Sequence, residues 1–492
     1  MRLVCPQQRL DCPSIIEVNL NLNCRDEIVP ILRALQHVYA NEALRRELLA
    51  LVGQDVNQTT SRKHGRRGMN YWEIAVLAGV RLGCNLDYDK LQDLAENHRR
   101  LRQIMGIGDW QEEVDFDWRR IEDNLIKLRP ETLKKISDLI VRAGHELEPQ
   151  AIEAVRGDTF VVETNIHYPT ESSLIADGLR KVVKLAVRLA AEQGLPGWRQ
   201  HKHWLSKVKK QVRAIDRASG AKTQAGQKRM HAGYQALLLM AVALLQRGRQ
   251  IAAALQAPEN MSVLAPPDRT GVKELLHYLD LTAQVCDTAQ RRVIAGETVP
   301  NAEKIFSIFE PHTELIKRGK QREPIQFGHS VLVVEDAVGF VVDYRVVANG
   351  VLDQDLVVPV MKELQERHNG KIKSASFDRG FHTPKNQEEL AKIVGTPSIA
   401  AKGEKKGRQQ QKEGTMAFRK ARQRHPGVES AIGALQAGNG MKRCRDRSKR
   451  GYERYVGLGI LGRNLQTLGK LLLAREQADC QAAKSKRKRA AA

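Results

Sequence analysis

The order of the strand-like runs constrains the fold of this chain more than any other feature. Runs rich in Val, Ile, Phe and Thr occupy residues 152–166, 329–347, 371–378 and 396–401, and helical patterns fill most of the rest. The run 329–347 reads as a hairpin, because two β-branched stretches flank a DAVG turn. Without the long helical stretch after residue 170, the order is β-β-β-α-β-α-β-α. This order predicts an α/β fold with a mixed five-stranded sheet, in which a meander is followed by two crossovers.

Helical sequence precedes this core and also interrupts it. Residues 1–150 read as a helical domain, in which Asn70 and Asp87 are expected to cap a helix-turn-helix-like pair at 70–97. Residues 170–300 read as a helical insertion between the first two core strands. The predicted core therefore comprises 151–169 and 301–476.

Two basic segments lack apolar periodicity. The segment 401–425 has the composition of a mobile loop over a charged partner, and 477–492 has that of a basic disordered tail. A soluble linker is the alternative for each of them.

The charge balance points to a polyanionic partner. The 492 residues include 80 Lys and Arg against 57 Asp and Glu, a net charge of +23. Phosphate backbones are the commonest partner of so basic a protein, although a merely soluble basic surface is the alternative.

The cysteines and the apolar runs indicate the compartment. Seven scattered cysteines without a CxxC pair fit a reducing cytoplasm and do not indicate a zinc ribbon. The longest apolar run, 236–245, is too short to span a bilayer, so we expect a cytoplasmic protein without a signal peptide.

Three carboxylates are candidates for a divalent-metal site. Asp158 and Asp378 lie at the edges of strand-like runs, and Glu429 opens a probable helix. Carboxylates are the hard oxygen ligands that Mg²⁺ prefers, and two such ions can activate a nucleophile and stabilise a leaving oxygen. Each acid has an ordinary alternative: a strand-end acid, a turn-forming Asp before Gly, and a first-turn helix acid.

Four blocks resemble a known family: DTFVVETNIHYPTESSL from Asp158, FGHSVLVVED, SFDRGFHTPKNQEEL around Asp378, and HPGVES around Glu429. They are similar to bacterial insertion-sequence transposases of the D-D-E type, in particular the ISNCY-like group, over about residues 60–476. The resemblance implies a ribonuclease-H-like catalytic core in which the three acids hold two Mg²⁺ ions, with Mn²⁺ as a substitute. One departure is Glu171, where similar sequences have Asp.

The resemblance also implies a reaction and its partners. Such an enzyme binds the terminal inverted repeats of an insertion sequence, cleaves at the element ends and joins the 3′-OH ends to target DNA. Double-stranded DNA is therefore the expected partner, and a homodimer or larger assembly on DNA is the expected form, with no membrane involved.

Basic and aromatic side chains supply candidate DNA contacts. Trp198 and Trp204 could stack on an extruded base, although core packing is the commoner role for such residues. The basic candidates are Arg66, Arg67, Lys207, Lys209, Lys210, Lys405, Lys406, Arg408, Lys442, Arg443 and Arg445.

Two other functions stay open at this stage. A metal-dependent nuclease without strand transfer would nick DNA and form no joined products. A catalytically inactive, transposase-derived DNA-binding repressor would be recognised by the loss of a core acid, and the sequence retains all three.

Overall fold

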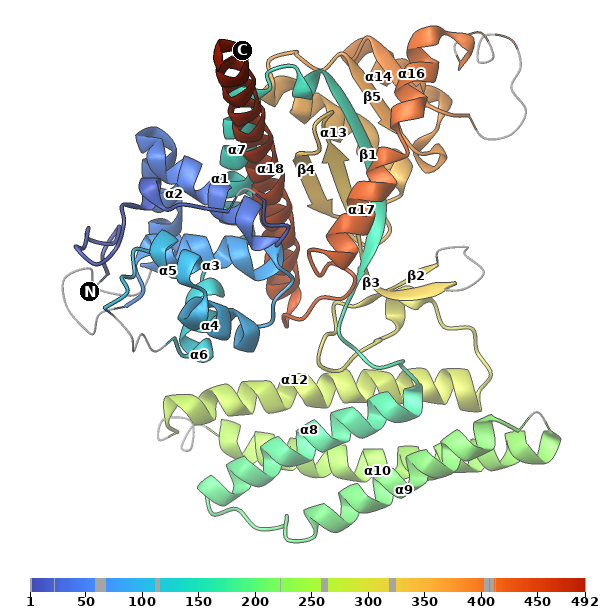
Figure 1. Ribbon diagram of the computed structural model, residues 1–492. Coiled ribbons are helices and arrows are strands. Elements are labelled where there is room, and N and C mark those ends of the chain that lie inside the picture. Colours follow the sequence, from blue (N-terminus) through green and yellow to red (C-terminus); the bar gives the residue numbers. More distant parts are fainter. Residues whose placement is uncertain are drawn as a thin grey trace. The chain divides into compact units, whose positions relative to one another are not determined.

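The structure is a computed structural model that describes residues 2–21, 23–57, 68–110, 116–221, 223–257, 264–317, 324–401, 407, 411 and 413–491. These residues form a mixed, mostly helical α/β structure with one six-stranded sheet. The chain divides into two compact units (Figure 1). Unit 1 comprises Met1–Asn165 and Gly328–Ala492, and unit 2 comprises Ile166–Phe327.

Strand β1 (Ala154–Glu163) lies in the middle of the sheet. It pairs antiparallel with β3 (Ile325–Glu335) on one side and parallel with β5 (Ser374–Phe377) on the other. Its apolar, β-branched sequence fits this central position, since a strand paired on both sides is buried on both faces. The sheet thus joins segments that are more than 160 residues apart in the chain.

Three further strands complete the sheet. β4 (Val341–Val346) pairs antiparallel with β3, and β6 (Thr396–Ile399) pairs parallel with β5. The five strands expected from the sequence are therefore present in the mixed arrangement expected for them. The sixth, β2 (Glu314–Lys317), also pairs with β3 and was not predicted. Four residues are too few to establish an alternating pattern.

The helices of unit 1 are α1 (Ile28–Ala40), α2 (Glu42–Val56), α3 (Tyr71–Gly83), α4 (Tyr88–Asn97), α5 (Arg99–Ile104), α6 (Trp118–Leu125), α7 (Pro130–Leu147), α13 (Asp353–Arg367), α14 (Pro384–Ile393), α16 (Met416–Arg424), α17 (Gly427–Ala437) and α18 (Lys449–Ala491). Those of unit 2 are α8 (Glu171–Glu192), α9 (His201–Ser219), α10 (Gln224–Gln256) and α12 (Pro266–Ala289), which continues into a π turn at Gln290–Ile294.

The predicted helix pair at 70–97 is present with the expected caps. The Asn70 side chain accepts a hydrogen bond from the Glu73 amide, and the Glu73 carboxylate accepts one from the Asn70 amide, while Asp87 caps α4. Helix α3 is almost entirely buried. The outward face of α4 carries Asp89 and Asp93, whose charges repel phosphate. DNA recognition by this pair stays a prediction.

The N-terminal helices share one hydrophobic core with the sheet and with α18. Helix α18 packs against α1, α3 and α7, and Figure 1 shows it running beside them. Residues 1–150 therefore do not form a compact unit of their own. Helix α18 also continues to Ala491, so the predicted disordered tail is wrong for 477–491. That stretch is rich in Ala, Gln, Lys and Arg, which are strong helix formers.

Unit 2 is built on a second hydrophobic core between the four helices that its described residues form. It extends beyond the predicted insertion, 170–300, to include residues up to Phe327. Among the described helices, α10 is long and apolar enough to cross a membrane by length and composition alone. Its Leu237, Ala241 and Leu244 are buried in the core of unit 2, whereas Leu239 and Val242 are exposed.

Candidate active site

The two aspartates lie at neighbouring positions on adjacent strands. Gly157 of β1 is opposite Phe377 of β5 in the parallel pair, so the next residues along each chain are Asp158 and Asp378. Adjacent strands are about 4.8 Å apart. The sheet therefore brings together two acids that are 220 positions apart in the sequence (378 − 158 = 220).

Both aspartates face the same side of the sheet. Two residues before Asp158, Arg156 donates to a carbonyl at the end of α16 (2.9 Å). Two residues before Asp378, Ser376 Oγ lies 3.3 Å from His425 Nδ1, just after the same helix. Because alternate strand residues share a face, the aspartates lie on the face that α16 and α17 cover. Thr159, on the other face, donates a hydrogen bond to the side chain of Asp353, the first residue of α13.

The immediate contacts of the two carboxylates differ. Asp158 Oδ1 accepts a hydrogen bond from the Thr159 amide (2.7 Å). Asp378 Oδ1 lies 3.6 Å from Arg422 Nη2, and its side chain is 53% exposed. Asp378 is thus open to a cation that approaches this face of the sheet.

Glu429 lies in the first turn of α17 and is exposed. Helix α17 packs against β1 through its buried side, which includes Val428 and Ala431. Among the described residues, no three His, Cys, Asp or Glu side chains lie close enough together to hold one ion. The structure thus pairs Asp158 with Asp378, and it places Glu429 on the neighbouring helix without joining it to them.

Buried charges hold β1 in place beside Asp158. Glu335 is almost fully buried and pairs with Arg156 (2.6 Å) and Arg463 (3.7 Å). Burial raises the pKa of Glu335 despite these two cations.

The imidazole of His425 is neutral at pH 7. Burial, followed by the charge of Arg422, lowers the pKa of His425 to about 4.

Arg156 and Arg422 lie beside the acids but were not predicted as site residues. Arg156 is two residues from Asp158, so the period of a strand could have placed them on one face. No local pattern around Arg422 could have shown that it approaches Asp378.

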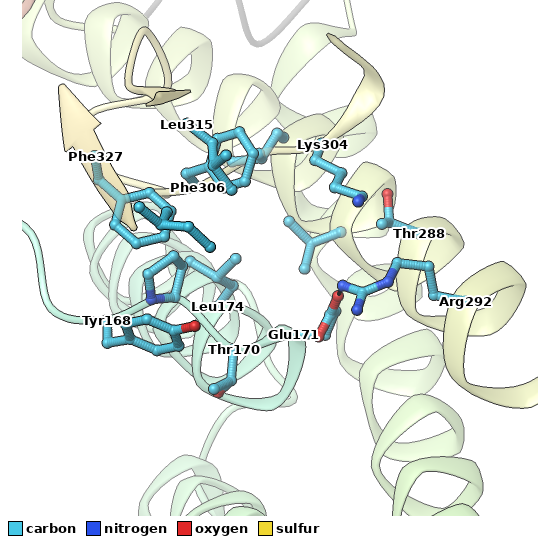
Figure 2. Close-up of a pocket in the computed structure, with 14 residues that line it drawn as sticks. Tyr168, Thr170, Glu171, Leu174, Thr288, Arg292, Lys304, Phe306, Leu315 and Phe327 are labelled. Carbon is cyan, nitrogen blue, oxygen red and sulfur yellow. Dashed lines mark hydrogen bonds and ion pairs between the residues drawn. The ribbon is translucent and has the colours of Figure 1, made fainter. Parts of the chain in front are cut away.

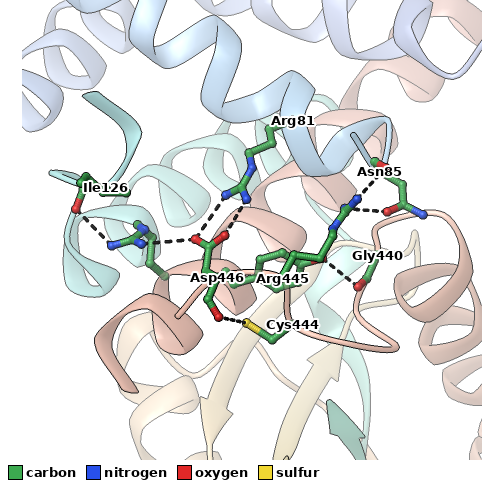
Figure 3. A network of polar contacts seen from close by, with 9 residues as sticks. Arg81, Asn85, Ile126, Gly440, Cys444, Arg445 and Asp446 are labelled. Atoms are coloured by element: carbon green, nitrogen blue, oxygen red, sulfur yellow. Dashed lines mark hydrogen bonds and ion pairs between the residues drawn. The ribbon is translucent and has the colours of Figure 1, made fainter. Parts of the chain in front are cut away.

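Arg445, a predicted DNA contact, is exposed, and its guanidinium also makes structural contacts. Figure 3 shows its guanidinium in a network that joins the loop before α18 to the end of α3. It donates to Tyr455 Oη (3.0 Å) and to the carbonyl and side-chain oxygens of Asn85 (3.3 and 2.8 Å). Beside it, Asp446 pairs with Arg81 (2.5 Å) and Arg454 (3.2 Å).

Lys442 and Arg443 lie beside the end of β1 that is remote from β5, where Arg443 forms a parallel bridge with Glu163. The Glu163 amide donates to the Lys442 carbonyl (3.1 Å), and the Cys444 amide donates back to Glu163 (2.7 Å). The Lys442 side chain is exposed, while Arg443 pairs with Glu163 (3.2 Å). Five residues of strand separate Glu163 from Asp158, about 17 Å at the rise of a strand.

The tryptophans of unit 2 pack in its interior. Trp198 is only 7% exposed, and its ring lies 5.8 Å from that of Trp204, on which the Arg247 guanidinium stacks. These contacts favour the packing alternative over base stacking. Lys207, Lys209 and Lys210 are exposed along α9. The remaining candidates, Arg66, Arg67, Lys405, Lys406 and Arg408, lie outside the described residues.

No family model, curated protein or solved structure matches this chain. The functional assignment therefore depends on the geometry of the sheet and on the sequence blocks around its acids.

Proposed function

We propose that this chain is a D-D-E-type DNA transposase that cleaves at the ends of an insertion sequence and joins the freed 3′-OH ends to target DNA. The observation that carries the proposal is the register of β1 and β5, which sets Asp158 beside Asp378 on one face. Two adjacent carboxylates are destabilising unless a cation or protons offset their charge. A cation site on a chain of net charge +23 suits a phosphodiester substrate.

The strand order supports a ribonuclease-H-like core. β4, β3 and β1 follow one another as an antiparallel set, and β5 and β6 add in parallel after α13 and α14. This is the meander-and-crossover arrangement expected for such a core, with helices on both faces of the sheet. It places the first acid on the central strand and the second at the end of the neighbouring strand.

The residues at this face suit divalent cations. Asp158 and the exposed Asp378 supply the hard oxygen ligands that Mg²⁺ and Mn²⁺ prefer, and Glu429 is the proposed third ligand. When bound, two such ions lower the pKa of a nucleophilic water or hydroxyl and offset the charge on the leaving oxygen. The same ligands can serve cleavage and joining, because both reactions are in-line displacements at phosphorus.

The surrounding residues position the DNA. Arg422, beside Asp378, can pair with a phosphate once that carboxylate binds a cation. The exposed Lys442 can contact the backbone farther along the duplex. His425, neutral at pH 7, is buried and serves in packing rather than proton transfer. We further propose assembly as a dimer or larger complex on paired element ends, in the cytoplasm.

The test is cleavage of a supercoiled plasmid that carries the native element ends, with Mg²⁺ present. The intact chain should cut the ends and form joined products. Asp158→Asn and Asp378→Asn preserve side-chain shape but remove the charge. Each should reduce cutting by more than about 100-fold, beyond the effect of changing a residue that only orients a metal ligand. Glu429→Gln should have the same effect. Glu388→Gln, an exposed acid on α14, is the matched control and should cut normally.

Each other outcome has a distinct meaning. Nicking without joined products would identify a nuclease, and DNA binding without nicking in Mg²⁺ or Mn²⁺ would identify a repressor. Equal cutting by the intact chain and Asp378→Asn would contradict the proposed site.

A further inference from the structure

Unit 2 contains a cavity of about 340 Å³ with aromatic rings on one side and cations on the other. Figure 2 shows Tyr168, Phe306 and Phe327 at one end, and Arg292 and Lys304 at the other. All of its lining residues belong to unit 2. A cavity of this size is at the lower end of the range for small-molecule sites, which begins at about 300 Å³.

The aromatic side is rigid but incompletely covered. The Tyr168 and Phe327 rings meet edge to face, with centroids 5.7 Å apart and planes at 88°. Phe306 packs on Phe327 at 5.6 Å. Tyr168 stands just before the capping box of Thr170, which fixes the start of α8. Its side chain nevertheless stays 72% exposed, so a second planar group can stack on the ring.

The cationic side carries more positive than negative charge. Among the described lining residues, Glu171 is the one carboxylate, and Arg292 pairs with it. Lys304 Nζ donates to the side-chain oxygen of Asn301 (3.2 Å). This acceptor is neutral, so the contact does not offset the lysine charge. Burial and the nearby charges of Arg292 and Lys317 lower the pKa of Lys304, as expected where cations gather. Arg292 projects from the π turn after α12, a local geometry that is frequent at functional sites.

We propose that this cavity binds one unstacked nucleotide of a DNA strand, with the base on Tyr168 and the phosphate beside Lys304 and Arg292. This inference rests on the proposed function, because it takes DNA as the substrate. A simple anion would not use the rings, and an apolar ligand would not use the cations. A nucleotide uses both sides, since every base has a π face and every phosphate a charge.

The test is binding by the full chain in EDTA, which prevents cleavage. The first probe is a duplex with one unpaired 2-aminopurine nucleotide at its end, and the second is the same duplex with a blunt end. The intact chain should quench 2-aminopurine fluorescence and bind the first duplex at least about five-fold more tightly, the lower limit for base–aromatic stacking. A third probe, free 2-aminopurine deoxyribonucleotide, distinguishes a nucleotide in solution from one in a strand.

The variants separate stacking from charge and from general DNA affinity. Tyr168→Ala should remove the preference and keep the affinity for the blunt duplex, whereas Tyr168→Phe should retain the preference. Lys304→Gln should weaken binding of the unpaired probe. Trp110→Ala removes a 75% exposed ring of unit 1 and should change nothing.

Three results would overturn the inference. One is a Tyr168→Ala chain that keeps the preference and the quenching. Another is free nucleotide that binds as tightly as the unpaired strand end, which would assign the cavity to nucleotides in solution. The third is equal affinity of the intact chain for both duplexes, which would leave the proposed function standing. Failure to bind either duplex would instead contradict the proposed function itself.

Discussion

At the scale of single residues, cations in the basic run between Lys442 and Arg450 differ in their contacts. Lys442 and Arg445 are both exposed, but the Arg445 guanidinium also donates to Tyr455 and Asn85. Asp446, in the same run, is the shared partner of two largely buried guanidinium groups, Arg81 and Arg454. Composition alone could not show that Lys442 and Arg445 differ, because both belong to one charged run of the sequence.

Replacing Asp446 should destabilise the protein strongly. Asp446→Ala leaves two buried cations without their carboxylate, and loss of one partner of a buried ion pair costs about 3–5 kcal/mol. Urea unfolding followed by circular dichroism should show a lower midpoint. The control is Glu42→Ala, which breaks an ion pair whose side chains are 70% and 78% exposed, and should cost about 0.5 kcal/mol. Equal midpoints for the two variants would contradict the structural role of Asp446.

At the scale of elements, glycines allow the close packing of α18 against the N-terminal helices. A Cβ added to Gly462 would lie 2.5 Å from the Gly83 backbone nitrogen at the end of α3. One added to Gly469 would overlap the Pro30 carbonyl of α1. These contacts are between backbones, so no side chain can move aside to relieve them.

Gly462→Ala should therefore destabilise unit 1, although alanine favours helices. Overpacking at such a contact costs about 1–3 kcal/mol. The same change at Gly433, an exposed position of α17 where an added Cβ would have no described atom of another element within 4 Å, should stabilise by about 0.5–1 kcal/mol. The opposite signs can be read from the thermal midpoints of the two variants. A stabilising Gly462→Ala would rule out the close crossing of α3 and α18.

The sequence predicts those elements that a few neighbouring residues determine. The Asn70 capping box, the two strands of the 329–347 run and the end of β5 at Asp378 each follow from a few neighbouring residues. What local patterns could not supply is the burial of Trp198 and the approach of Arg422 to Asp378, because both depend on contacts with distant elements. The sequence allowed the strands that carry Asp158 and Asp378 to be neighbours in the sheet. It could not give the register of β1 and β5 that sets the two aspartates side by side.

At the scale of the whole molecule, the chain joins its two ends into one core. The N-terminal helices, the sheet and α18 contribute to a single hydrophobic cluster, so unit 1 is complete only when the last helix is in place. Unit 2 has its own core and enters the chain between β1 and β3. The acids, the basic loop at Lys442 and the candidate cation site all belong to unit 1, which is therefore the proposed catalytic unit.

The most direct test of this site replaces one ligand atom and changes the metal. Asp378→Cys substitutes a soft thiolate, which binds Mg²⁺ poorly and Mn²⁺ better. We expect the variant to lose end cleavage in Mg²⁺ and to regain it in Mn²⁺. Its ratio of Mn²⁺ to Mg²⁺ activity should exceed that of the intact chain on the order of ten-fold or more, whereas Asp378→Ser should not recover. An unchanged ratio in Asp378→Cys would contradict a metal ligand at this position.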